Sequence, residues 1–460
     1  MVTYELKKAP GVPLYEALYR CIRGDILSGK LKPGEKLPSK RALAQNLEVS
    51  KITVETAYNQ LLSEGYLRSE EKVGYFVEAV EHPPVSEAPR NTVQCAEERK
   101  WLLDLTANGA EQFPFSVWMK LQREVTLDYG QALLLPIPNR GIPELRQAIA
   151  NHLSDFRGMR VDPENILIGA GTDFLYNLLM QLLGREKIYA VEEPGYGKIR
   201  KIYAAGGVKS VSALMDEQGV IPEGLQSAEG LQSADVLHFS PSHHFPTGLV
   251  TPVSRRMELL SWAGDSRWII EDDYDSEFRF DAHPMPAMQS LDRAGRVIYM
   301  NTFSKSIAPS IRISYMVLPA DLMGEFQRRL GFYSCTVPSF EQYTLARFLS
   351  RGCFEKHINR MRKLYKNRRN LVISFLNRCP FADRLTILEQ DAGLHFLLKV
   401  DTVLTDRELT ERLARAGIRV QALSEFYHDT AENRRCLVIN YSGIQESALE
   451  QALDAAKEIM

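Results

Sequence analysis

An apolar, β-branched stretch begins at Val297 and ends in the hydroxyl residues Thr302 and Ser304, directly before a single lysine, Lys305. Short apolar runs of this kind are typical of buried strands, and open α/β sheets place their ligands at the carboxyl ends of such strands. The stretch therefore predicts a sheet that carries Lys305 at a ligand-binding edge.

The neighbours of Lys305 suggest a particular chemistry. A lysine in a partly desolvated pocket loses proton affinity and can form a Schiff base with an aldehyde. Thr302, Ser304 and Arg312 are donors of the kind that hold a phosphate. An aldehyde next to a phosphate is what pyridoxal phosphate (PLP) offers. On this stretch alone, an ordinary lysine at the end of a strand is an equal alternative.

Length and composition favour a globular protein of two or three domains. The chain has 460 residues, more than one ordinary hydrophobic core, and 45% of them are hydrophobic and 25% charged. Its six cysteines are scattered without a CxxC pair, which disfavours a disulfide framework or a zinc site. The N-terminus has no apolar leader and no run approaches a membrane span, so we expect a cytoplasmic protein without membrane contact.

Positive charge gathers near the N-terminus. Residues 1–80 contain 12 Lys and Arg against 10 Asp and Glu, whereas the rest of the chain contains 44 against 48. The excess lies at Lys30, Lys32, Lys36, Lys40, Arg41 and Lys51. It is a modest signal for nucleic-acid binding, and a solvated surface explains it equally well.

The first 80 residues have the pattern of a winged helix-turn-helix. Apolar residues at helical spacing predict helices over residues 13–30, 39–47 and 51–63, with Ser39 and Ser50 as N-caps and Gly65 as a stop. Residues 31–37 are predicted to form a turn, and residues 66–69 and 74–77 alternate like a two-stranded wing.

The start of the third helix is the candidate DNA-reading surface. There Ser50, Lys51 and Thr53 suit base edges, while Lys40 and Arg41 suit phosphates. The alternative is a protein-interaction module, because short three-helix units also serve that role. Residues 38–44, 49–54 and 61–67 resemble the GntR-type DNA-binding domain, which implies a dimer that binds operator half-sites and favours Arg41, Lys51 and Thr53 as contacts. Lys40 stands where that family more often has an acidic residue.

The rest of the chain divides into a linker and a large α/β domain. Residues 79–100 are rich in proline and polar residues, which predicts a linker between a DNA-binding domain over residues 1–78 and the domain that follows. From residue 101 to 460, apolar strands alternate with helices. We expect a large subdomain over about 101–335 and a small one over about 336–460.

Three turns in this domain carry candidate ligand contacts. Gly171-Thr172 opens a predicted helix and suits a phosphate, although many glycine turns are only turns. Tyr196 follows a strand end and could stack on a flat ring, or could be an ordinary core or surface tyrosine. The adjacent His243 and His244 have no third metal ligand nearby, so we expect no metal site.

A second strand end, at Glu271-Asp272-Asp273-Tyr274, collects carboxylates next to a tyrosine. A carboxylate at such a position can keep a pyridine nitrogen protonated, and a tyrosine can hydrogen-bond a phenolic oxygen. Successive residues of a strand point to opposite faces, so only one of the two aspartates can serve. A calcium or magnesium cluster is the competing interpretation.

In combination, these motifs over residues 101–460 resemble fold-type I, aspartate aminotransferase-like PLP enzymes. Together with the GntR-type head, the whole chain resembles the MocR/GabR subfamily of bacterial transcription regulators. The resemblance implies a mixed, mostly parallel sheet and PLP linked to Lys305. It assigns Asp272 to the pyridine nitrogen, Tyr274 to the ring hydroxyl and Tyr196 to stacking on the ring. The phosphate would be held by Gly171, Thr172, Thr302, Ser304 and Arg312.

The chain departs from this pattern at two positions. True aminotransferases of this class carry Asn before Pro-Thr-Gly, where this chain has Phe245. An arginine expected near the C-terminus, which would clamp a substrate carboxylate, is replaced by Gly443. Lys198 stands where the GABA-responsive regulator has a second arginine and is the candidate effector contact, although it is only a point charge.

These features favour a PLP-dependent transcription regulator over a working aminotransferase with a tethered head. The expected partners are operator DNA, a small-molecule effector and a second copy in a head-to-tail homodimer, with RNA polymerase as an additional candidate. We expect the effector to be an amine, an amino acid unlike GABA, a dipeptide or PLP itself.

Overall fold

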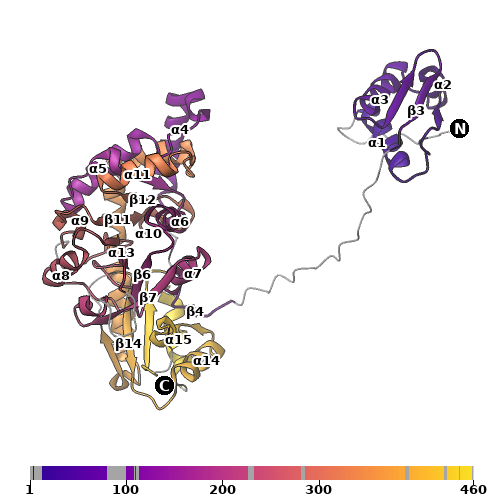
Figure 1. Cartoon of the computed structure of the whole chain (residues 1–460). Helices are drawn as coiled ribbons and strands as arrows, with labels where there is room; N and C mark the ends of the chain where they lie inside the picture. The colour runs from indigo at the N-terminus through magenta and orange to yellow at the C-terminus, as the bar shows by residue number, and fades with distance from the viewer. Residues whose placement is uncertain are drawn as a thin grey trace. The chain divides into compact units, whose positions relative to one another are not determined.

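The computed structural model describes residues 4, 13–79, 100–107, 109, 113–225, 233–280, 285–388, 393–428, 433–444, 446–457 and 459. The chain divides into two compact units, Met1–Glu98 and Arg99–Met460, and each is described by itself (Figure 1). Most of the linker expected over residues 79–100 lies outside the described residues.

The N-terminal unit contains three helices and a small sheet. The helices are α1 (Leu14–Leu27), α2 (Lys40–Asn46) and α3 (Lys51–Ser63), close to the predicted ranges. Ser39 and Ser50 cap α2 and α3 as predicted, because their hydroxyls accept hydrogen bonds from the backbone N–H groups of Ala42 and Thr53.

The wing has one more strand than the sequence predicted. Strands β2 (Leu67–Glu70) and β3 (Gly74–Val77) form the expected hairpin, and β1 (Lys36–Leu37) adds a third strand, antiparallel to β3. The prediction of a simple turn over residues 31–37 was therefore wrong for the last two. A two-residue strand has no periodicity of its own and forms only because β3 supplies its hydrogen-bonding partners.

The C-terminal unit is built on a mixed, mostly parallel sheet of eight strands. Their order is β5-β12-β11-β10-β9-β6-β7-β8. The strands are β5 (Ile166–Gly169), β6 (Ile188–Glu193), β7 (Lys209–Asp216), β8 (Gly219–Val220), β9 (Val236–Phe239), β10 (Trp268–Asp272), β11 (Val297–Thr302) and β12 (Ser314–Val317). The four central strands β11, β10, β9 and β6 run parallel, so their carboxyl ends meet at one edge.

Helices cover both faces of this sheet, which is why its inner strands are largely apolar and buried. One face packs against α6 (Thr172–Leu183), α7 (Gly197–Ala205) and α11 (Ala320–Leu330). The other packs against α8 (Val253–Ala263), α9 (Met288–Leu291), α5 (Pro143–Arg157) and α12 (Ser339–Ser350). In Figure 1, α8 and α9 lie on one side of the sheet and α6 and α7 on the other.

A smaller subdomain follows the long helix α13 (Cys353–Arg378). Its sheet has the order β13-β14-β17-β16, formed by Leu385–Leu388, His395–Val400, Cys436–Asn440 and Gln421–Ala422. Helices α14 (Asp406–Arg415) and α15 (Glu446–Ala456) pack on it.

The subdomain boundary differs from the expectation at its start. Strand β4 (Leu103–Asp104) pairs in parallel with β15 (Ile418–Arg419), so residues 103–104 belong with the small subdomain although they precede the large one. Helix α4 (Phe115–Tyr129) then begins the large part. A pairing between residues so distant in sequence leaves no local pattern.

Candidate functional site

The carboxyl edge of the large sheet surrounds a cavity of about 220 Å³. Its wall contains nine of the ten residues that the sequence proposed for cofactor or effector: Thr172, Tyr196, Lys198, Asp272, Tyr274, Thr302, Ser304, Lys305 and Arg312. The tenth, Gly171, is the N-cap of α6 next to Thr172. Parallel strands bring most of these residues together because they lie at the carboxyl ends of strands or in the segments that follow them.

Gly171 and Arg312 form a tight corner of this cavity. Gly171 has φ +89°, and a Cβ atom there would lie 2.2 Å from Nη2 of Arg312. The guanidinium thus lies against the first turn of α6, where backbone N–H groups point outward. Nearby, the Oγ atom of Ser304 is buried without a hydrogen-bond partner. The Arg312 guanidinium, the Ser304 hydroxyl and the N–H groups at the start of α6 together suit a phosphate.

Thr302 also stabilises the turn that precedes Lys305. Its Oγ1 atom accepts hydrogen bonds from the backbone N–H of Ser304, at 3.2 Å, and from the Ser314 hydroxyl, at 2.7 Å. It thereby caps the short helix α10 (Phe303–Ser306), which carries the lysine. Thr302 both lines the cavity and fixes the turn that presents Lys305.

Lys305 lines the cavity and is partly buried. Burial lowers the pKa of its ammonium group, and the negative charge of Asp275 opposes that effect. An amine with a lowered pKa is unprotonated over a wider pH range, which is the form that attacks a carbonyl carbon.

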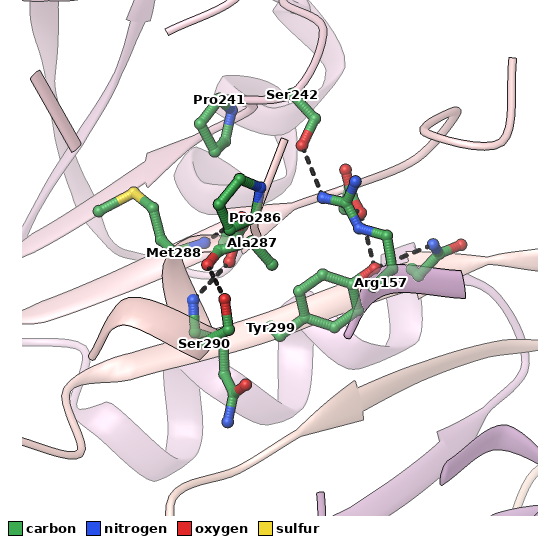
Figure 2. Close-up of polar contacts among 12 residues, drawn as sticks. Arg157, Pro241, Ser242, Pro286, Ala287, Met288, Ser290 and Tyr299 are labelled. Carbon is green, nitrogen blue, oxygen red and sulfur yellow. Dashed lines mark hydrogen bonds and ion pairs between the residues drawn. The ribbon is translucent and has the colours of Figure 1, made fainter. Parts of the chain in front are cut away.

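Asp272 and Asp273 point to opposite faces of the sheet, as strand alternation predicts. Asp272 faces the cavity, accepts a hydrogen bond from the Tyr176 hydroxyl through Oδ2, and has a buried Oδ1 without a partner. Asp273 lies on the other face, where Oδ2 is 3.1 Å from Nη2 of Arg157 and 2.7 Å from the Tyr299 hydroxyl. Figure 2 shows Arg157 between Ser242 and Tyr299 on that face.

Two aromatic residues bound the outer part of the cavity. Tyr196 is 50% exposed, and its ring meets that of Phe245 edge-to-face at 6.0 Å. Phe245 also packs on His395 and Phe426 of the small subdomain. The residue that replaces the usual asparagine therefore fills space between the subdomains with an apolar ring.

Lys198 is engaged by a carboxylate that sequence reasoning missed. Its Nζ atom lies 2.7 Å from Oδ2 of Asp173, and Nη2 of Arg312 lies 3.5 Å from the same oxygen. Asp173 follows Thr172 directly, so it was visible as part of the glycine turn, but only the fold brings it to Lys198. The expected effector cation is thus largely compensated.

A second group of missed residues lies under Asp272. His238 has Nε2 3.5 Å from Oδ2 of Asp272 and Nδ1 2.7 Å from the Tyr203 hydroxyl. Glu192, in the cavity wall, is buried, and burial raises the pKa of its carboxyl well above the ordinary value. Its position at the end of β6 was the one signal that could have identified it.

The adjacent histidines take part in separate hydrogen bonds. His243 pairs with Asp275, whereas His244 contacts the Thr247 hydroxyl at 2.6 Å, and burial lowers the pKa of His244 to about 3. Within the described ranges, no group of three or more His, Cys, Asp or Glu is arranged to hold a metal ion.

Strand β17 is apolar where it packs near Phe245. Gly443 follows in a turn whose preceding residue, Ser442, accepts a hydrogen bond from Arg368 through its backbone carbonyl. The face of β17 near Phe245 presents Cys436 and Val438, both buried and apolar. Close by in the sequence, the guanidinium of Arg434 stacks over the Tyr427 ring at 4.4 Å.

In the N-terminal unit, the start of α3 is exposed. Arg41, Ser50 and Lys51 are exposed and Thr53 is partly exposed, while the Ser50 and Thr53 hydroxyls lie 2.8 Å apart. Lys40 differs, because its Nζ atom pairs with Glu55 at 2.8 Å and lies over the Tyr75 ring at 5.3 Å. This pairing argues against the expected phosphate contact and makes Lys40 a link between α2, α3 and the wing.

Known proteins resemble the chain over its whole length. It is 36% identical to the uncharacterized HTH-type transcriptional regulator YdeL of Bacillus subtilis, covering 99% of this chain and 98% of that protein. It is 33% identical to the probable rhizopine catabolism regulatory protein MocR of Rhizobium meliloti, covering 98% and 94%. Residues 14–77 match the gntR family of bacterial regulatory proteins, and residues 101–455 match aminotransferase class I and II.

The chain belongs to the MocR/GabR-type subfamily of GntR regulators. This MocR-type chain is accordingly a helix-turn-helix transcription regulator with an aminotransferase-like domain. It is also 31% identical to the HTH-type pyridoxine biosynthesis transcriptional regulator PdxR of Corynebacterium glutamicum, covering 94% of this chain and 92% of that protein.

Solved structures show the same fold for the C-terminal unit of the MocR-type chain. An archaeal alanine:glyoxylate aminotransferase aligns with TM-score 0.70 and 23% identity over 79% of this chain and 92% of that chain. A kynurenine aminotransferase of Pyrococcus horikoshii, in complex with PMP, aligns with TM-score 0.68 and 23% identity over 79% and 91%. Among the described helices, none is long and apolar enough to cross a membrane.

Proposed function

We propose that this regulator holds PLP in the cavity at Lys305 and uses it to sense a primary amine. The observation that carries the proposal is the pair of buried, unpartnered oxygen atoms, Asp272 Oδ1 and Ser304 Oγ, in the wall of the cavity that Lys305 also lines. Buried polar atoms normally have partners, so an orphaned pair in one cavity favours a polar ligand.

The residues fit PLP group by group. Arg312, Ser304 and Thr172 would hold the phosphate, Asp272 would pair with the ring nitrogen, and Lys305 would bind the aldehyde carbon. PLP supplies an electrophilic carbon to which an amine can bind covalently. Tyr196 would cover the ring from the open side, and the Tyr274 hydroxyl would donate to the ring oxygen.

The effector would be an amine that the protein does not hold through a carboxylate group. Asp173 compensates Lys198, and the strand face near Phe245 is apolar. The guanidinium of Arg312, which would hold the phosphate, is then the only bidentate donor among the described residues of the wall, and none remains for an effector carboxylate. We expect isothermal titration of the PLP-loaded protein to show no ordinary binding of GABA. Binding of GABA with typical effector affinity would contradict this choice of ligand.

Occupancy of the cavity would change operator binding through the linker, because a ligand that binds two states unequally shifts their populations.

The protein would act in the cytoplasm as a head-to-tail homodimer. Large apolar side chains support a second copy, since Phe115, Met119, Leu127, Leu134 and Leu135 are at least 57% exposed on and after α4. Light scattering on the purified chain measures the oligomeric state.

The rival function is a working aminotransferase with a tethered DNA-binding head. The apolar Phe245 at an asparagine position and the missing clamp disfavour it, and the relatives named above are regulators. Steady turnover of an amino acid with a keto acid would establish the rival.

The deciding experiment combines spectroscopy and DNA binding. We expect the purified chain with PLP to show a visible band that shifts when the effector amine is added, and an operator affinity that changes with it. Lys305→Ala should abolish both responses while leaving basal operator binding intact. Operator binding of Lys305→Ala that still responded to the effector would refute coupling through this lysine.

A further inference from the structure

Next to Tyr274 lies a buried acid–base pair that the proposed function does not use. Nδ1 of His243 is 2.8 Å from Oδ2 of Asp275, and the two side chains are 2% and 3% exposed. The Tyr274 hydroxyl lies 3.3 Å from the same Nδ1 atom. Two polar groups, the Asp275 carboxylate and the Tyr274 hydroxyl, thus compete for one ring nitrogen beside the cavity.

Hydrogen-bond chemistry decides which group is the donor. An ionised carboxylate can only accept, so the short contact requires Nδ1 of His243 to carry its hydrogen and donate it to Asp275. Nδ1 then has no lone pair for Tyr274. The Tyr274 hydrogen must point elsewhere, and the open direction is the cavity that Tyr274 lines.

The imidazole of His243 is held in this orientation by the small subdomain. A Cβ atom on Gly393 would lie 1.7 Å from Cε1 of His243, so the glycine backbone packs directly on the ring. The His395 ring is 4.8 Å away and is itself fixed by a 3.0 Å hydrogen bond to the carbonyl of Pro246. The ring of His243 has little room to turn.

The surrounding charges keep the Tyr274 hydroxyl protonated. Burial, followed by the carboxylates of Asp275, Glu192, Asp272 and Asp273, raises the pKa of Tyr274 well above its ordinary value. Lys305 faces the same region, and burial lowers the pKa of His395 far below its ordinary value, which leaves that ring uncharged. The Tyr274 hydroxyl therefore keeps its hydrogen and can always donate a hydrogen bond. Only the direction in which the O–H bond points can change.

We propose that Asp275 and His243 are positioning residues that aim the Tyr274 hydroxyl into the cavity, toward the ring oxygen of the bound PLP. This rests on the proposed function, which places PLP at Lys305. A donor aimed at that oxygen stabilises its deprotonated form and lowers the pH at which the lysine-bound cofactor loses its proton. Loss of the donor raises that midpoint.

The test is a pH titration of the visible absorption of the full-length, PLP-loaded chain. His243→Leu removes the Nδ1 donor, whereas His243→Asn keeps an N–H near the same place. We expect His243→Leu and Tyr274→Phe each to raise the midpoint by about one to two pH units, the effect of one hydrogen bond to a charged oxygen. His243→Asn should stay close to wild type.

A double variant separates positioning from a general structural effect. If His243 acts through Tyr274, then His243→Leu combined with Tyr274→Phe shifts the midpoint no further than Tyr274→Phe alone. His152→Leu is the matched control, because His152 is a partly buried histidine on α5 outside the cavity wall. The midpoint of this variant should equal that of wild type.

The outcomes distinguish the two proposals. A visible band with an unshifted midpoint in His243→Leu, or additive shifts in the double variant, would overturn the positioning role and leave PLP binding in place. A wild-type chain without a visible band at any pH would overturn both, because the tyrosine would have no cofactor oxygen to serve.

Discussion

The Asp272 carboxylate accepts a hydrogen bond from the Tyr176 hydroxyl through Oδ2 and leaves Oδ1 buried and unpaired in the cavity wall. Tyr176 thereby orients the carboxylate while its second oxygen faces the space for a ligand. A buried acceptor without a partner is costly in free energy, and a ligand that donates a hydrogen bond to it removes that cost.

Asp272→Asn should therefore weaken PLP binding more than Tyr176→Phe does. Loss of a charge-assisted hydrogen bond of about 1.5–3 kcal/mol corresponds to a Kd for PLP raised about 10- to 100-fold, whereas Tyr176→Phe should raise it by less than about tenfold. Equilibrium dialysis measures both. Equal Kd values for wild type and Asp272→Asn would show that Asp272 does not contact the cofactor.

Lys305 should react with PLP at lower pH than an ordinary lysine. Its pKa lies below the usual 10.5 because of burial, so the unprotonated fraction at a given pH is larger. The pH dependence of the rate of reconstitution with PLP should have its midpoint below pH 10.5. Asp275→Asn removes the charge that raises this pKa and should lower the midpoint further. A midpoint at or above the ordinary value would contradict the assignment.

The buried ion pair of Arg157 and Asp273 should be a large contributor to the stability of the C-terminal unit. Arg157→Leu leaves a buried, uncompensated carboxylate and should lower the free energy of unfolding by about 3–5 kcal/mol. All four tryptophans lie between residues 101 and 268, so tryptophan fluorescence during urea unfolding reports on this unit alone. Arg415→Leu, which breaks an exposed ion pair in the same unit, is the control and should cost less than about 1 kcal/mol.

Lys40 and Lys51 should differ in how they affect DNA binding. Lys51 is exposed at the start of α3, so Lys51→Ala should reduce the slope of log affinity against log salt by about one if it contacts a phosphate. Lys40→Ala should leave that slope unchanged, because Glu55 already pairs with the ammonium group. Fluorescence anisotropy with an operator fragment at several salt concentrations measures both slopes. A reduced slope for Lys40→Ala would restore Lys40 as a phosphate contact.

Local patterns predicted much of the architecture. The caps at Ser39 and Ser50, the helix starts behind them and the apolar strand that ends near Lys305 depend on neighbours within one turn or one strand. The side to which Asp272 points also follows from strand alternation, because the period of two is a property of the backbone itself. For these features the sequence and the structure agree.

Contacts between distant residues were decided by the tertiary structure alone. Asp173 compensates Lys198, Glu55 engages Lys40, and His243 meets Asp275 and Gly393, although none of these pairs is adjacent in the sequence. Two charged side chains look equally available in a sequence until the fold brings a partner to one of them. The sequence by itself determined which residues reach the ligand-binding edge, because strand ends are local features. Which of them remain free to bind a ligand was decided by packing, because burial and ion pairing depend on segments that meet only in the folded chain.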